Sequence, residues 1–476
     1  MNFRHCRFEC TGSAASLIFM IVFMKTLTLL LTIALTSFFF DSCTVKEDIT
    51  VDEAEKLSVT FPELDTFMPE EDASLQKRSS KRGVCTNFRI PEMPQFLGSG
   101  VTWCYNWGHS PLSDDRWAML QSNGMVCLPM VWNAGFSQNN IATFKAKDAD
   151  ADYLLGYNEP NLTDQANMTP QQAAAVWPDF VAAAKSLGLK IVGPAVNYGT
   201  LSGYNDPVKW YDEFLACPGV SIDDIDAIAL HCYMPNGQAV KSLMIRKFVK
   251  YGKPIWLTEF ENGEAQNEAS QIGFCQETVT YLEADPHVER YAWFMDNTGS
   301  NNRAPHFPLI TMPEMGGRES YLTDLGKTYV GLSSFDKETC YPVDHNIPAE
   351  HYSGQIIEET AGEEEWGTYV GTYPTSDFYG NLEIRNVKND AWVEYRVNVP
   401  KTTKYRIDLR YNATSETVVK IDCAGATSAI ATLAGNGEWA TAGVEMALPS
   451  GEQTIRLSVP VGSLTLNWLR VTAPLE

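Results

Sequence analysis

Positive charge is scarce in this sequence of 476 residues. Lysine and arginine number 36 against 59 aspartates and glutamates, so the formal net charge at pH 7 is −23. The phosphates of nucleic acids would repel such a protein, and no nucleic-acid ligand is expected. A neutral polymer is an easier partner for an acidic chain.

Closely spaced cysteine pairs are also missing. The cysteines that follow Cys43 have no CxxC spacing, which argues against a zinc site. Export would permit disulfides among them, but the sequence alone cannot pair them. They are Cys85, Cys104, Cys127, Cys217, Cys232, Cys275, Cys340 and Cys423.

The N-terminal apolar run, TLTLLLTIALTSFFF after Lys25, is too short for a membrane span. It predicts a signal peptide over residues 1–43, with translation expected to start at Met24. Cys43 and the acidic residues after it resemble the lipid-modified cysteine and export signal of bacterial surface lipoproteins. We therefore expect an exported protein anchored at the outer cell surface, with soluble secretion as the alternative.

Residues 44–90 have no sustained hydrophobic period. They are acidic first and then polar and basic, a composition typical of a flexible tether. A tether of this kind suits an enzyme that is anchored at a surface.

The rest of the chain has ample material for buried cores. Hydrophobic residues make up 44% and aromatic residues 11% of the sequence, so we expect a globular protein and not a disordered one. Aromatic rings stack on the faces of sugars as readily as they fill cores. The aromatic content therefore permits a carbohydrate-binding protein without requiring one.

Short apolar runs alternate with helical patterns over residues 91–338. This alternation predicts a parallel β-sheet wrapped by helices. Seven strands can be recognised. The two that end in glutamate are three strands apart and only one strand follows them, which favours a (β/α)8 barrel with one of its first three strands too weak to read. The predicted strands cover residues 101–107, 125–132, 153–159, 190–196, 225–233, 254–260 and 290–297.

Two of these strands deliver a glutamate. Tyr153–Asn161 reads YLLGYNEPN and contains Glu159. Pro254–Phe260 reads PIWLTEF and contains Glu259. Pro160 is expected to hold the residue before it in an extended backbone. A single glutamate at a strand end is as often a surface charge or a helix cap, but the pair predicts two carboxylates that face one cleft at the carboxyl ends of the strands.

Polar and aromatic residues end several other predicted strands on the same side. Packing is the alternative role for any one of them, and His231 in particular has the alternative of a hydrogen-bonded core histidine. Their joint placement predicts a cleft lined with aromatic rings and amides, which suits a saccharide. The expected substrate-binding residues are Trp103, Asn106, Trp132, Asn158, His231, Tyr233 and Trp293.

Four segments, GYNEP, HCY, WLTEF and YAWF, resemble glycoside hydrolase family 128 in their order and spacing. These enzymes are endo-β-1,3-glucanases with a catalytic core of the alkali-sensitive-linkage type. The resemblance covers residues 94–332. It implies a retaining hydrolase in which Glu159 is the acid/base and Glu259 is the nucleophile.

The implied roles have a chemical basis. A glycosidic oxygen is a poor leaving group, so one carboxyl must be protonated near neutral pH, and burial or a neighbouring carboxylate achieves this by raising its pKa. The other must stay ionised to attack the anomeric carbon. No metal or other cofactor is expected for this chemistry. The resemblance further implies that Asn158 binds the sugar 2-hydroxyl, that His231 and Tyr233 border the nucleophile, and that Trp132 and Trp293 are sugar platforms.

Residues 345–476 carry short alternating segments with turn residues between them. This pattern predicts an all-β sandwich. From IPAEHYS to NWLRV the segment resembles a family 6 carbohydrate-binding module, in which an aromatic pair and a late asparagine hold the sugar.

The module resemblance implies its own site residues. Trp439 with Tyr379 or Phe378 is the expected aromatic pair, and Thr465 stands where the family has the asparagine. Glu350 is the expected ligand of a structural calcium ion.

These predictions describe an α/β protein, a (β/α)8 barrel followed by a C-terminal all-β sandwich. The expected function is that of a retaining endo-β-1,3-glucanase, which hydrolyses β-1,3-glucan polysaccharide and oligosaccharides as a monomer. Two alternatives stay open: another clan A glycosidase that acts on a different β-glycan, and a surface glycan-binding protein whose barrel does not catalyse. The presence of both glutamates argues against the second.

Overall fold

The computed structural model describes residues 49–65, 75–297, 306–311, 319–356, 370–378, 382–388 and 391–475. The predicted signal peptide with Cys43 lies outside these ranges, as does Tyr379. Within the described part of the chain, no helix combines the length and the apolar character that crossing a membrane requires.

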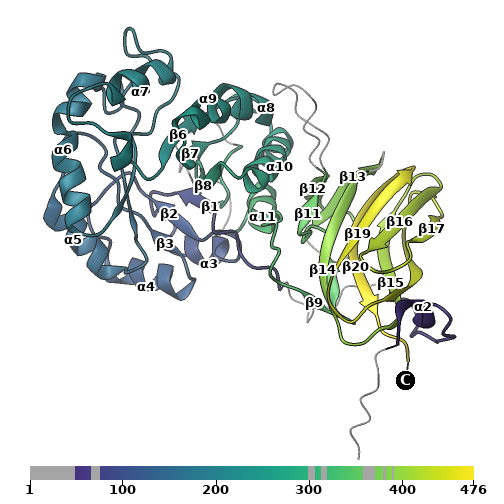
Figure 1. Cartoon of the computed structure of the whole chain (residues 1–476). Helices are drawn as coiled ribbons and strands as arrows, with labels where there is room; N and C mark the ends of the chain where they lie inside the picture. The colour runs from purple at the N-terminus through teal and green to yellow at the C-terminus, as the bar shows by residue number, and fades with distance from the viewer. Residues whose placement is uncertain are drawn as a thin grey trace, which may run out of the picture. The chain divides into compact units, whose positions relative to one another are not determined.

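The first part of the fold is a barrel of parallel strands. They are β1 (Arg82–Cys85), β2 (Trp103–Tyr105), β3 (Val126–Cys127), β4 (Tyr153–Leu155), β5 (Lys190–Val192), β6 (Ile228–Cys232), β7 (Ile255–Phe260) and β8 (Val288–Trp293) (Figure 1). Six pair in the order β3-β2-β1-β8-β7-β6, and β4 pairs with β5. Isolated parallel bridges close the ring, Met130 with Leu155 after β3 and Val192 with Ala227 before β6. The predicted (β/α)8 barrel is confirmed.

A helical segment follows every strand and covers the outside of the barrel (Figure 1). Polar N-caps start the two longest helices, where Thr169 and Asn267 each form a capping box. The segments are α3 (Met93–Leu97), α4 (Asp114–Ser122), α5 (Gln138–Lys147), α6 (Pro170–Ser186), α7 (Pro207–Leu215), η1 (Ile222–Asp224), α8 (Gly237–Ala239), η2 (Val240–Ile245), α9 (Arg246–Phe248), η3 (Val249–Tyr251), α10 (Glu268–Ala284) and α11 (Asp324–Gly331).

The strand that could not be recognised in the sequence is β1. The prediction of a flexible tether over residues 44–90 is wrong at its carboxyl end, because all four residues of β1 are buried and pair with β2 and β8. The strand is only four residues long and begins with Arg82 and Gly83, so it has no apolar run to reveal it. A short helix, α2 (Val51–Ala54), also lies within the predicted tether. With β1 counted, Glu159 follows the fourth strand and Glu259 lies in the seventh, as predicted.

Arg82 is fully satisfied although it is buried. Its Nη2 forms a salt bridge with Glu283 at 3.0 Å, and its Nε donates to the Tyr291 hydroxyl at 2.9 Å. Backbone carbonyls of residues 329–333 accept its other hydrogens. A buried charge needs this many partners to offset its loss of water. The network lies at the amino end of β1 and fixes the chain that leaves α11.

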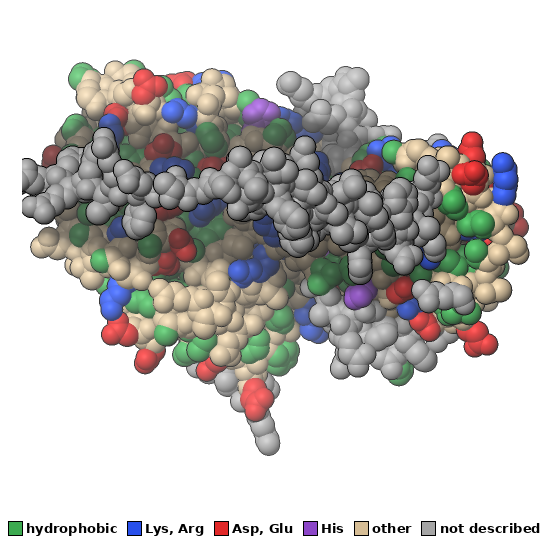
Figure 2. Space-filling model, turned by 60° about the horizontal axis from the view of Figure 1, so that its bottom comes forward, with side chains coloured by type: hydrophobic (Ala, Val, Ile, Leu, Met, Phe, Trp, Pro, Cys, Tyr) green, Lys and Arg blue, Asp and Glu red, His purple; other side chains and the backbone are tan. Residues whose placement is uncertain are grey.

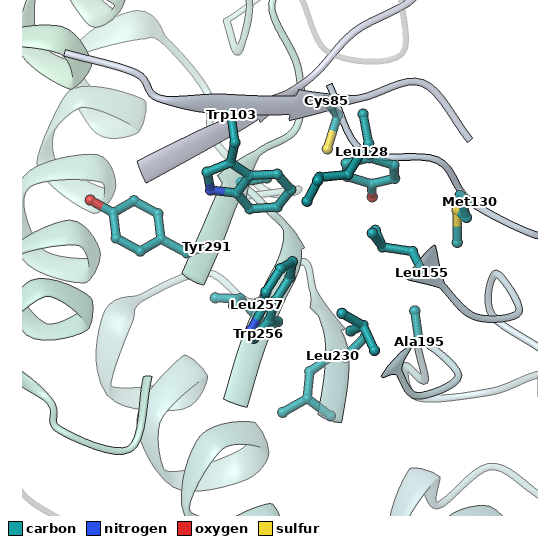
Figure 3. Close-up of a cluster of buried hydrophobic side chains, with 14 of the residues drawn as sticks. Cys85, Trp103, Leu128, Met130, Leu155, Ala195, Leu230, Trp256, Leu257 and Tyr291 are labelled. Carbon is teal, nitrogen blue, oxygen red and sulfur yellow. The ribbon is translucent and has the colours of Figure 1, made fainter. Parts of the chain in front are cut away.

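Large apolar side chains from the barrel strands and the residues that follow them form one buried cluster, part of which Figure 3 shows. Trp103 of β2 packs against Trp256 of β7 with ring centroids 5.3 Å apart. The interior is therefore a packed core, which leaves only the strand ends for a site.

The C-terminal part is confirmed as a sandwich of two antiparallel sheets. Burial alternates along its strands, as in β14, so each sheet turns one face to the shared core. One sheet has the order β12 (Gly371–Pro374), β13 (Leu382–Lys388), β20 (Ser463–Thr472), β15 (Thr403–Asn412), β18 (Trp439–Leu448), with β10 (Asn346–Pro348) beside β20. The other has the order β11 (Gly354–Gln355), β14 (Trp392–Val399), β19 (Gly451–Val461), β16 (Thr417–Cys423), β17 (Ala429–Leu433), with β9 (Tyr341–Pro342) beside β14.

The described cysteines are unpaired, and the surface carries charges of both signs (Figure 2). All eight cysteines from Cys85 to Cys423 lie in the described residues and are free thiols. On the face shown in Figure 2, acidic and basic side chains of the described residues are interspersed.

Candidate active site

A cleft of about 990 Å³ opens where the barrel strands end. Both predicted glutamates line it, together with the aromatic side chains Trp107, Trp132 and Phe294. Amides and further charged groups complete its wall, among them Asn158, Gln165, Asn197, Arg89, Asp164 and Glu261. An aromatic cleft with a few convergent polar groups is the usual form of a saccharide site.

Glu159 sits in a turn directly after β4. Its φ is +42°, in the left-handed region, so the prediction of an extended backbone at this position is wrong. Two hydrogen bonds explain the turn: the Glu159 N–H donates to the Ala195 carbonyl at 2.8 Å, and its own carbonyl accepts from the Leu162 N–H at 3.0 Å. The residue is only 6% exposed, and Asn197 Nδ2 donates to its Oε1 at 3.1 Å.

Glu259 is surrounded by neutral donors. Tyr105 Oη and Trp107 Nε1 donate to its Oε1 at 3.1 and 2.6 Å, and the Tyr233 hydroxyl donates to its Oε2. The carboxyl group is 4% exposed. Three donors that would each lose an acceptor on protonation favour the ionised form of this side chain.

His231 connects the two glutamates. Its Nδ1 lies 3.1 Å from Glu159 Oε1 and 3.4 Å from Glu259 Oε2. When both glutamates are ionised, their oxygens can only accept, so Nδ1 carries the proton and donates to them. The three ligand-type atoms, one from each residue, all lie within 4.8 Å of one another. The side chain of His231 is fully buried.

The pKa shifts of this cluster depend on that proton. Burial raises the pKa of Glu259, and the charge of Glu159 adds to the rise, which exceeds the lowering by His231. Burial also raises the pKa of Glu159, but the hydrogen bond and charge of His231 outweigh it, and the net pKa is lowered. For His231, burial lowers the pKa, yet the two carboxylates raise it above the ordinary value. These two opposite shifts favour a proton on His231 beside an ionised Glu159.

Asn158 lines the cleft beside Glu159 and is held by one hydrogen bond, from its Nδ2 to Gln165 Oε1 at 3.1 Å. Its Oδ1 is buried and has no partner among the described residues. Trp132 is half-buried in the cleft wall, and Tyr233 also lines the cleft. Sequence reasoning therefore placed these three residues in the cleft correctly.

Two predicted substrate contacts, Trp103 and Trp293, are wrong because both are buried, and the contact of Asn106 stays a prediction. Trp103 is 1% exposed and its Nε1 donates to the Lys81 carbonyl, so it belongs to the barrel core. Trp293 is fully buried, and its Nε1 donates to the Phe307 carbonyl. Phe294, the next residue, faces the cleft instead. Asn106 is not among the residues that line the cleft, and its Oδ1 is buried without a partner in the described chain.

Three further residues at strand ends, which were not among the predicted substrate contacts, form hydrogen bonds with the two glutamates. Tyr105 and Trp107 contact Glu259, and Asn197 contacts Glu159. All three are polar or aromatic residues at predicted strand ends, which is the only signal the sequence offers for them. Asp164 belongs to the polar loop after the first glutamate strand, whereas for Arg89 we find no sequence signal.

The aromatic residues predicted to bind sugar in the sandwich are exposed or partly exposed. Phe378 is 81% exposed, and Trp439 is partly exposed with its Nε1 donating to Ser376 Oγ at 3.3 Å. Arg410, whose Cζ lies 5.8 Å from the centroid of the Trp439 ring, forms a two-bond salt bridge with Asp377 at 2.8 and 2.7 Å. An exposed ring beside a fixed polar group is compatible with a sugar contact.

Glu350 was predicted to bind calcium. It is buried, and its Oε2 has no partner among the described residues. Calcium takes six to eight oxygen ligands. Within the described part of the chain Glu350 joins no group of three carboxylate, histidine or cysteine ligands, and its role as a calcium ligand stays a prediction.

Comparisons with known proteins agree on the barrel. A model of the family described as glycosyl hydrolase catalytic core matches residues 84–329. Alkali-sensitive linkage protein 1 of Schizosaccharomyces pombe (strain 972 / ATCC 24843) is 26% identical over 276 residues, 53% of this chain and 44% of the relative. The chain thus spans less than half the length of that curated relative. These two matches confirm the predicted catalytic core, and the family match ends before the sandwich.

Solved structures are also similar to this chain. A family 128 subgroup II endo-β-1,3-glucanase from Pseudomonas viridiflava is 36% identical, with a TM-score of 0.47, and covers 54% of this chain and 99% of its own. A subgroup I endo-β-1,3-glucanase from Amycolatopsis mediterranei, in complex with laminaritriose, is 26% identical, with a TM-score of 0.38, and covers 52% and 98%.

Proposed function

Since the chain belongs to the glycosyl hydrolase catalytic core family and is a glycoside hydrolase, we propose that it is a retaining endo-β-1,3-glucanase. The pair of glutamates carries this proposal, because one oxygen of Glu159 and one of Glu259 lie within 4.8 Å of each other. Retaining glycosidases hold their carboxyl groups about 5–5.5 Å apart, whereas inverting ones need about 6.5–9.5 Å to admit a water molecule. The short separation supports direct attack by one glutamate on the sugar.

In the proposed reaction Glu259 is the nucleophile. Its carboxylate attacks the anomeric carbon while Glu159 donates a proton to the departing glycosidic oxygen, which forms a glycosyl ester and frees the leaving sugar. Glu159, now a carboxylate, then removes a proton from a water molecule that cleaves the ester. The donors Tyr105, Trp107 and Tyr233 stabilise the Glu259 carboxylate before attack and after its release.

His231 supplies the proton in this scheme. In the empty cleft the lowered pKa of Glu159 leaves it ionised, so acid catalysis requires a proton transfer first. His231 Nδ1 lies 3.1 Å from Glu159 Oε1, a distance short enough for transfer along the hydrogen bond. Substrate in the cleft excludes water and favours the neutral pair, in which the imidazole and the carboxyl group carry no charge. No step in this scheme requires a metal ion or another cofactor.

The choice of β-1,3-glucan rests on the resemblance of GYNEP, HCY, WLTEF and YAWF to family 128. The cleft adds a wall of aromatic rings, Trp107, Trp132 and Phe294, which suits the faces of glucosyl units. Asn158 is placed to bind the sugar 2-hydroxyl, since its buried Oδ1 lacks a partner among the described residues.

A panel of glucans tests the substrate. Laminarin and curdlan should release reducing sugar, and β-1,4- and β-1,6-linked glucans should not. Early products should be a mixture of oligosaccharides, as an endo-acting enzyme gives, and Glu259→Gln protein should give none. Hydrolysis of another β-glycan alone would favour a different clan A specificity. Binding of glucan without any hydrolysis would favour the glycan-binding alternative.

The proposal also covers the sandwich, the N-terminal segment and the oligomeric state. The sandwich holds the enzyme on insoluble glucan through Trp439 and Phe378. The N-terminal segment exports the chain and anchors it through Cys43, and replacement of this cysteine should release the protein from the membrane fraction. Gel filtration should give the mass of a monomer.

A further inference from the structure

Glu261 is a buried carboxyl group of the cleft that the proposed mechanism leaves unused. It lies two residues after Glu259, and both line the cleft. Glu259 lies in β7 and Glu261 is the first residue after it, so the continuing extended chain turns both side chains to one cavity. Glu261 is 5% exposed.

One oxygen of Glu261 is fixed by an amide. Gln271 of α10 donates from Nε2 to Glu261 Oε2 at 2.7 Å and to the Asn262 carbonyl at 3.0 Å. Its Oε1 accepts from the Asn262 N–H at 3.1 Å, so this fully buried amide is completely used and cannot turn. Among the described residues no hydrogen bond reaches Glu261 Oε1. That oxygen is the one left for a ligand.

Glu261 forms no salt bridge with another described residue. Burial raises its pKa to about 7, against a small lowering by Gln271. The titratable or charged groups that line the cleft around it are Glu159, Asp164, Tyr233, Glu259 and Arg89. Below pH 7 the carboxyl group is protonated. Because Oε2 accepts a hydrogen bond from Gln271, the proton is on Oε1, and Oε1 then donates into the cleft. Above pH 7 the group is an anion that only accepts.

We propose that Glu261 binds a sugar hydroxyl or ring oxygen of the glucan, in the subsite beside the sugar that reacts at Glu259. This inference rests on the proposed function and names a residue that determines affinity for the substrate. A bound glucosyl unit covers the last exposed part of the carboxyl group and so favours its neutral form. Glucan affinity should therefore fall as the pH rises through 7.

The parent protein of the test is full-length Glu259→Gln, which does not hydrolyse the ligand. Calorimetry measures how tightly this parent and its further variants bind laminarihexaose. Adding Glu261→Ala should weaken binding about tenfold at pH 5.5, the effect of one hydrogen bond to a buried group. Adding Glu261→Gln should change little at pH 5.5, because the amide accepts from Gln271 and donates into the cleft like the protonated acid. The parent should bind at least about threefold more weakly at pH 8 than at pH 5.5, and the Glu261→Gln protein should not.

Glu264→Gln is the matched control, because it removes an acid from the same loop whose side chain is exposed. It should bind like the parent at both pH values. A Glu261→Gln protein that keeps the pH step of the parent, or a Glu261→Ala protein with unchanged affinity, would overturn the inference alone. A parent that binds no β-1,3-glucan would overturn the proposed function and this inference with it. Unfolding temperatures of all variants show whether each one is folded.

Discussion

The two ends of the barrel strands hold buried charge in opposite ways. At the amino end of β1, Arg82 has one acid partner, Glu283, and every guanidinium nitrogen donates to an acceptor. At the carboxyl ends, Glu159 and Glu259 share one histidine. The first cluster is balanced in charge and in hydrogen bonds. The second has two acids for one base.

The two ends of the barrel also differ in whether their buried polar atoms have hydrogen-bond partners. His231 Nε2 and Asn158 Oδ1 are buried without partners among the described residues, whereas the guanidinium of Arg82 has partners throughout. A buried polar group without a partner is costly to the fold. We infer that the amino end is built for stability, and that the carboxyl end keeps its spare acids and free polar atoms for a ligand.

Glu259→Gln should show the largest effect on function. The amide cannot attack the anomeric carbon, so kcat on laminarin should fall by about a thousandfold or more. The unfolding temperature should stay level or rise, since the change removes one of two neighbouring acids. Steady-state kinetics and calorimetry measure both, with Glu264→Gln as the control. A near-normal rate would contradict the assigned nucleophile.

Arg82→Met should show the largest effect on stability. It leaves Glu283 buried without its cation, which costs on the order of 3–5 kcal/mol of unfolding free energy. Lys77→Met is the control, because it breaks an exposed ion pair with Glu338 and should change little. Chemical denaturation measures the difference. Equal effects of the two variants would contradict the distinction between the two ends of the barrel.

Glu350→Gln extends the comparison to the sandwich, where this acid is buried and forms no salt bridge with another described residue. Burial raises its pKa to about 7, so the folded state holds its proton more tightly than the unfolded state. This stabilising proton is lost as the pH rises from about 4.5 through 7, and the wild type should lose roughly 3 kcal/mol that the variant keeps. Thermal unfolding at pH 5 and pH 8 measures this loss of stability, with Glu445→Gln, a change at an exposed residue, as the control. A variant with the pH dependence of the wild type would contradict the assignment.

Trp439→Ala should have the smallest effect. Loss of one stacked ring should weaken retention on insoluble glucan by on the order of 1 kcal/mol, with hydrolysis of short soluble oligosaccharides unchanged. Ile430→Ala, which truncates another exposed side chain of the sandwich, is the control. Pull-down on curdlan measures retention. Equal retention of both variants would mean that the sandwich does not hold glucan through this ring.

The sequence allowed the glutamates to be predicted because each ends an apolar run within a recognisable motif. The same motifs located Asn158 and Tyr233. The strand β1 could not be predicted, because four residues that include Arg82 and Gly83 carry no hydrophobic pattern. The barrel is visible in the sequence wherever strands are long enough to be apolar.

The wrong aromatic contacts have a geometric cause. Trp103, Tyr105 and Trp107 share one side of the chain, but only the last two come far enough along it to reach Glu259. Trp293 and Phe294 are neighbours, and alternation sends one into the core and the other into the cleft. Sequence patterns mark a strand end, but they do not fix the residue at which the core stops.

The anomeric form of the first product tests the central claim most directly. If Glu259 attacks and water then displaces it, two inversions leave the new reducing end in the β form. Proton NMR during the first minutes of laminarihexaose hydrolysis, before mutarotation, should show the β anomer in excess. An α anomer as the first product would contradict the double displacement and with it the roles assigned to the two glutamates.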